Sequence, residues 1–74
     1  MIKVRDEALI KAFGEHVRKL RKENELTLEA LAGKAGIDAR QLSYIELGQT
    51  NVTISTINVI AKALEMSLSE LMEI

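Results

Sequence analysis

Few side chains in this sequence have the chemistry of a catalytic or metal site. The chain has one histidine, His16, and no cysteine, so a structural zinc site lacks the nitrogen and sulfur ligands it needs. The residues Gly33 to Gly36 share letters with a phosphate-binding loop but lack its Gly-x-x-x-x-Gly-Lys-Ser/Thr spacing. The adjacent carboxylates of Asp6 and Glu7 lie where a helix is predicted to begin, which suits the helix dipole. We therefore expect no enzyme activity, no metal and no cofactor.

Positive charge is concentrated near the start of the chain. Residues 1–24 carry seven basic and four acidic groups, whereas the total over 74 residues is a net charge of −1. The basic run from Arg18 to Lys22 either binds a polyanion or forms the solvated face of an amphipathic helix. The near-neutral total is itself unlike that of most nucleic-acid-binding proteins, which are basic.

The length and composition indicate one globular domain over residues 1–74. Apolar residues make up 47% of the chain and charged residues 28%, which is not the composition of a disordered segment. No run of about 18 apolar residues occurs, so we expect no membrane span. The absence of cysteine fits a cytoplasmic protein.

Apolar residues recur at helical spacing through almost the whole chain, which predicts an all-α bundle. Polar N-caps and glycine C-caps divide this pattern into five helices. Their predicted ranges are about 6–23, 27–36, 38–48, 53–64 and 67–71. The predicted core-facing residues are Ile10, Phe13, Val17, Leu20, Leu28, Leu31, Ala32, Ala35, Leu42, Ile45, Ile54, Ile57, Ile60, Ala61, Leu64, Leu68 and Leu71.

Two local signals refine this prediction. Asp38 with Gln41, and Ser67 with Glu70, have the three-residue spacing of a capping box. Gly14 lies inside the first predicted helix, where glycine costs about 1 kcal/mol relative to alanine. We therefore expect another helix to approach closely at this position.

Residues 27–48 are the most informative segment. Two short predicted helices are joined by a turn of about three residues that contains Gly36, which is typical of a helix-turn-helix. Ala32 precedes this glycine by four residues, where a small side chain lets the two helices touch. The other positions that pack such a pair are all apolar: Leu31, Ala35, Ile37, Leu42 and Ile45.

The same segment and its flanks resemble a known family. The pattern is Leu20-Arg21, Leu26-Thr27, Leu31-Ala32, Ala35-Gly36-Ile37, Leu42-Ser43-Tyr44-Ile45-Glu46 and Gly48, followed by Ile57, Ile60-Ala61-Lys62-Ala63-Leu64 and Ser67-Leu68-Ser69-Glu70-Leu71. It resembles the Xre/Cro type of helix-turn-helix domain, shared with lambdoid phage repressors, over about residues 13–71. The resemblance implies a five-helix lambda-repressor-like bundle. In length the chain looks like small stand-alone members, such as restriction–modification controller proteins and antitoxins.

The resemblance implies that the third helix reads DNA from the major groove. The implied base contacts are Ala39, Arg40, Ser43 and Tyr44. Arg40 is the strongest candidate, because a guanidinium matches O6 and N7 of guanine. The family also implies an ion pair between Arg21 and Glu46, which would orient the reading helix.

Phosphate contacts are expected at helix starts and loops, where amides and hydroxyls can bind without net charge. The implied residues are Thr27, Leu28, Gln41, Gln49, Thr50 and Asn51, with Lys22 and Lys34 either assisting or solvated. Many family members have Gln where this chain has Leu28, and Pro where it has Val52. Leu28 can therefore contribute its amide but no polar side chain.

An apolar surface near the C-terminus predicts a partner. Val52, Thr56, Val59 and Ala63 form a second stripe on the fourth predicted helix, and such a self-complementary patch gives a two-fold dimer. The predicted dimer residues are Val59, Ala63, Met66, Leu71, Met72 and Ile74.

Two functions are consistent with these features of the sequence. One is a homodimeric transcriptional regulator that binds a palindromic operator in double-stranded DNA. The alternative is a protein-interaction module, such as an antitoxin that binds a toxin through this surface, with weak or no DNA binding.

Overall fold

The five predicted helices all form, close to their predicted bounds. They are α1 (Glu7–Glu23), α2 (Leu28–Ala35), α3 (Ala39–Glu46), α4 (Ile54–Ala63) and α5 (Leu68–Leu71). The computed structural model describes residues 4–74, so the first three residues of the predicted domain lie outside the described part. Within residues 4–74 the fold is all-α, with no strand.

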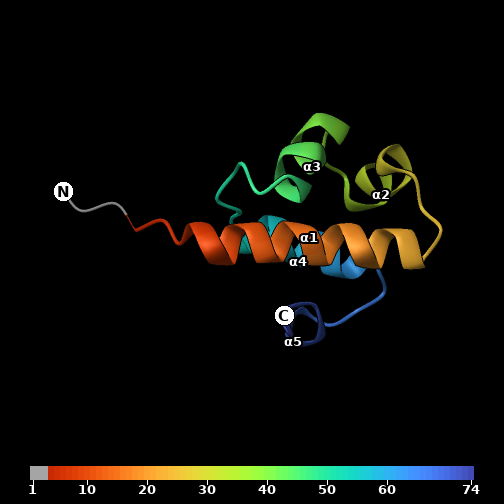
Figure 1. Ribbon diagram of the computed structural model, residues 1–74. Helices are drawn as coiled ribbons and strands as arrows, with labels where there is room; N and C mark the ends of the chain where they lie inside the picture. The colour runs from red at the N-terminus through yellow and green to blue at the C-terminus, as the bar shows by residue number, and fades with distance from the viewer. Residues whose placement is uncertain (1–3) are drawn as a thin grey trace.

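The long helix α1 runs across the middle of the molecule (Figure 1). It packs against α3, while α2 packs against both α3 and α4, and α5 closes the bundle against α4. In Figure 1, α2 and α3 lie on one side of α1, and α5 with the C-terminus lies on the other. The helix-turn-helix pair is therefore placed at one surface of the bundle. Among the described residues, none of these helices has the length and apolar character to cross a membrane.

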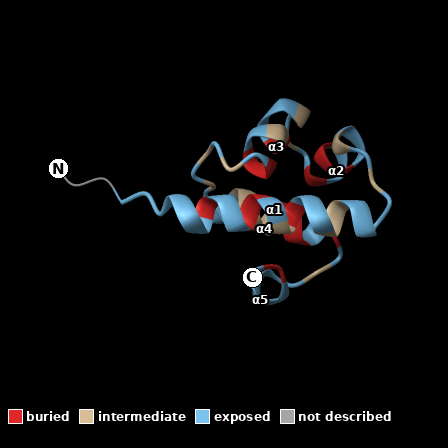
Figure 2. Cartoon of the chain, in the orientation of Figure 1, coloured by how far each residue is buried: buried red, intermediate tan, exposed pale blue. Residues whose placement is uncertain are grey.

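The core lies where the helices face one another (Figure 2). Its largest fully buried side chains are Val17, Leu31, Leu42, Ile45, Ile60 and Leu71. Two predicted core residues are wrong, and the first of them, Ile54, is 75% exposed. Ile54 is the first residue of α4, ahead of the turns that pack against the bundle. Leu68, at the first position of α5, is likewise exposed while Leu71 fills the core.

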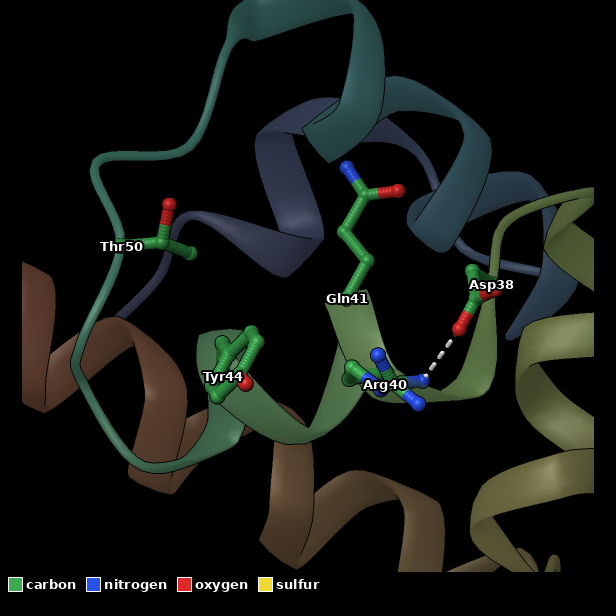
Figure 3. A pocket seen from close by; sticks show the side chains of 5 residues that line it. All are labelled: Asp38, Arg40, Gln41, Tyr44 and Thr50. Carbon is green, nitrogen blue, oxygen red and sulfur yellow. Dashed lines mark hydrogen bonds between the residues drawn. The ribbon is translucent and has the colours of Figure 1, made fainter.

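Each helix begins at a polar residue that accepts a backbone hydrogen bond. These N-caps are Asp6, Thr27, Asp38, Thr53 and Ser67. The capping box of Ser67 and Glu70 forms as predicted, and its hydrogen bonds lower the pKa of Glu70. The predicted box of Asp38 and Gln41 does not form. Asp38 accepts from the amide of Arg40 instead, at 2.7 Å, and Gln41 extends away from it (Figure 3).

The turn between α2 and α3 is fixed by the end of α2. Gly36 has a left-handed φ of 73°, and the amide of Ile37 donates to the carbonyl of Ala32 at 3.0 Å. This is the Schellman motif, in which the helix ends at a residue in the left-handed conformation, which glycine adopts most easily. The ends of α1 and α4 make the same bond with Glu25 and Glu65 in the left-handed position. The sharp turn leaves α3 packed across α2.

Gly14 marks the close approach that the sequence predicts. A Cβ atom at this position would lie 2.9 Å from the carbonyl oxygen of Glu46, and closer still to that of Ile45. Only a glycine lets the backbone of α1 lie against the last turn of α3. The position and orientation of α3 on the bundle therefore depend on this contact.

Candidate functional site

α3 has one buried side and one exposed side. Leu42 and Ile45 are fully buried and attach the helix to the core. Arg40, Gln41 and Tyr44 are exposed on the opposite side, and Tyr44 keeps 48% of its surface accessible. The helix is therefore anchored to the core on one side and exposes polar side chains to solvent on the other.

These side chains surround an open hollow of about 280 Å³ (Figure 3). Asp38, Arg40, Gln41 and Tyr44 line it from α3 and its N-cap, and Thr50 completes it from the loop before α4. Within residues 4–74 the Arg40 guanidinium makes no hydrogen bond or ion pair. Its five N–H donors are thus available to a ligand.

Arg21 and Glu46 join α1 to the last residue of α3. The guanidinium Nε and Nη2 donate to the two carboxylate oxygens at 2.7 and 3.0 Å, and Nη1 donates to the carbonyl of Leu26 at 2.9 Å. The Glu46 side chain is only 6% exposed. The hydrogen bond with Glu46 raises the pKa of Arg21 above its ordinary value. Arg21 is therefore bonded both to Glu46 on α3 and to the backbone after α1. The pair orients α3, and its bonds leave Arg21 unavailable to an external ligand.

The four predicted base-contact residues do not lie in equivalent places. Arg40 and Tyr44 line the hollow. Ser43 is half-buried and outside the hollow, and Ala39 packs against the core from the first position of α3. A contact from Ala39 to a ligand would therefore need the ligand to approach the N-terminal end of α3.

The predicted phosphate-contact residues fall into three groups. Thr27 caps α2 and is exposed, but the side chain of Leu28 packs against the core, which leaves its amide. Gln41 shares the hollow with Arg40 rather than standing apart from it. The third group is the loop residues Gln49, Thr50 and Asn51, which link α3 to α4. Lys22 and Lys34 are exposed.

Two predicted dimer residues are wrong as surface contacts. Leu71 is 0% exposed and Ala63 is also buried, because α5, which carries Leu71, packs against α4, which carries Ala63. Val59 and Met66 are half-buried against the same core. Met72 and Ile74 keep exposed apolar surface at the C-terminus. The available patch is therefore smaller than predicted.

Sequence reasoning missed Arg5. Its guanidinium donates to the carbonyl of Gln49 at 3.3 Å and also pairs with Glu7, on the first turn of α1. Arg5 precedes the first helix and lies outside the helix-turn-helix pattern, so its type and spacing gave no sign of this contact. Only the return of the chain after α3 brings Gln49 to it.

Comparison with known proteins identifies relatives over most of the chain. The family model described as Helix-turn-helix matches residues 17–71. The control protein C.SmaI of Serratia marcescens is 38% identical over 60 residues, covering 81% of this chain and 71% of that protein. The transcriptional repressor RghR of Bacillus subtilis (strain 168) is 39% identical, over 85% of this chain and 47% of that protein.

A solved structure has the same fold as this chain. The restriction–modification controller protein C.AhdI of Aeromonas hydrophila superposes with a TM-score of 0.81 and is 36% identical. The match covers 89% of this chain and 98% of that chain. The similarity therefore extends to the whole helical arrangement and not to the helix-turn-helix alone.

Proposed function

Because this chain belongs to the helix-turn-helix family, whose relatives here are transcriptional regulators and controller proteins, we propose that it binds an approximately palindromic DNA operator as a homodimer. The observation that carries the proposal is the exposed side of α3. Arg40, Gln41 and Tyr44 are presented around one hollow, and the Arg40 guanidinium is unpaired within residues 4–74. A helix of this kind fits the major groove, where base edges are read.

The proposed roles follow from placement on the surface. Arg40 contacts a guanine edge, and Tyr44 contacts a thymine methyl group or a phosphate. Gln41 reaches either the same bases or the adjacent phosphate, since it shares the hollow with Arg40. The exposed start of α2 at Thr27 and the loop from Gln49 to Asn51 bind phosphates on the two sides of α3. Ala39 contributes only where the duplex approaches the first turn of α3. Ser43, which is half-buried and outside the hollow, contributes less than Arg40 and Tyr44.

The Arg40→Ala variant tests the reading role. A cognate site is first selected from a random duplex pool, and affinity is then measured by fluorescence anisotropy. Loss of a bidentate guanine contact is expected to cost about 1–3 kcal/mol on the cognate site, an affinity loss of about 5- to 150-fold. Binding to random DNA is expected to change much less. The exposed Lys62→Ala variant is the control, because Lys62 lies in the last turn of α4 and outside the hollow. An equal loss of Arg40→Ala on both DNAs would refute base reading.

Dimerisation is tested at the C-terminal surface. Met72 and Ile74 are apolar and exposed, which supports a small self-complementary patch. The Ile74→Asp variant is expected to sediment as a monomer at concentrations where the unmodified protein is dimeric, because a two-fold axis brings the two new charges together. Sedimentation velocity at micromolar concentration measures this. A monomeric unmodified protein at high micromolar concentration would contradict the proposal. In the dimer, half-sites lie about 34–36 Å apart.

A further inference from the structure

The chain after α3 returns along the N-terminal half of α1. Gly14 meets the carbonyl oxygens of Ile45 and Glu46, and one turn earlier the backbone of Lys11 lies against Gly48. A Cβ at Gly48 would be 2.9 Å from Cα of Lys11. The next residue, Gln49, then accepts the hydrogen bond from Arg5. The segment before α1 and the loop after α3 are therefore neighbours.

This contact places a cation beside an uncharged loop. The loop side chains of Gln49, Thr50 and Asn51 are neutral, and we propose above that they bind phosphate. The Arg5 side chain remains 41% exposed, although it pairs with Glu7 and donates to the carbonyl of Gln49. Arginine has five N–H donors, so donors remain after these two interactions.

We propose that Arg5 binds a DNA phosphate together with the loop from Gln49 to Asn51, which makes the segment before α1 part of the interface. The inference rests on the proposed function and deepens it, because it adds a phosphate-binding residue that lies outside the helix-turn-helix. The guanidinium is suited to this role because its fork matches phosphate oxygens and its charge is permanent. The bond to the Gln49 carbonyl holds the guanidinium at the loop before DNA arrives.

The salt dependence of binding measures this contact. Each neutralised phosphate contributes about 0.9 to the slope of log K against log salt. A dimer carries two copies of Arg5, so Arg5→Gln is expected to reduce the slope by about 1.8. Between 50 and 200 mM salt, the unmodified protein should therefore lose about 12-fold more affinity than the variant does. The Arg5→Lys variant keeps the charge and should keep most of the slope.

Lys62→Gln is the matched control, because it also removes one positive charge, but from the last turn of α4. It is expected to leave the slope within about 0.3 of the unmodified value. An unchanged slope in Arg5→Gln overturns the inference, and so does an equal loss in Lys62→Gln. A protein that binds no duplex at all refutes the proposed function itself, whereas a steep slope unaffected by Arg5→Gln refutes only the role of Arg5. Thermal unfolding of each variant checks that the fold is retained.

Discussion

Replacing Gly14 with alanine is expected to lower the free energy of unfolding by about 1–3 kcal/mol or more, although alanine is the better helix former. The new Cβ would meet the backbone carbonyl groups of Ile45 and Glu46, and backbone cannot move aside as a flexible side chain can. α1 and α3 must therefore separate, and overpacking of this kind costs about 1–3 kcal/mol or more. For 74 residues the total stability is about 4–11 kcal/mol, so the loss is a large fraction of it.

Gly33→Ala is the matched control for this experiment. Gly33 lies inside α2, but a Cβ there would have no neighbour within 4 Å. The same substitution is thus expected to stabilise the protein by about 0.5–1 kcal/mol through helix propensity alone. Urea denaturation followed by circular dichroism measures both values. Equal stability of Gly14→Ala and the unmodified protein would show that α3 does not depend on the close approach.

The fold could be predicted from the sequence because its local signals agree with each other. Thr27, Asp38, Thr53 and Ser67 are N-caps in the structure as predicted, and apolar periodicity located the helices between them. Gly36 ends α2 as predicted, because its backbone adopts the left-handed conformation. No such signal existed for Glu25 and Glu65, which adopt the same conformation without being glycine. There the packing of the following residues overrides the local preference.

The candidate site was less predictable because exposure depends on tertiary packing. Periodicity assigned Ile54 to the core, but only the position of α4 on the bundle decides that its first residue projects outward. Leu71 was predicted both as a core residue and as a dimer residue, and the return of α5 onto α4 makes it core. Arg40 and Tyr44 are predicted as base contacts only through the family resemblance. The neighbour of Arg5 could not be inferred, since Gln49 is 44 residues away along the chain.

Replacing Arg21 with methionine is expected to lower the free energy of unfolding by about 3–5 kcal/mol, because it leaves the Glu46 carboxylate buried without its partner. The substitution also removes the bond to the carbonyl of Leu26. In the unmodified protein the raised pKa of Arg21 means that the folded state binds this proton more tightly than the unfolded state. Its contribution is thus complete below the ordinary arginine pKa and is lost only as the pH rises through the folded value. Around neutral pH we therefore expect this contribution to be constant.

The double variant Arg21→Met with Glu46→Leu separates the ion pair from the burial of one charge. Replacing both partners by apolar side chains removes the unpaired carboxylate, so most of the stability lost in Arg21→Met is expected to return. The measurement is a double-mutant cycle by urea denaturation, with a coupling energy of at least about 2 kcal/mol as the expected result. If the double variant is as unstable as Arg21→Met, the loss comes from the position of α3 rather than from the buried charge. If the double variant is as stable as the unmodified protein, the ion pair orients α3 without adding net stability. In that case the double variant should bind the cognate site more weakly than the unmodified protein, although the two are equally stable.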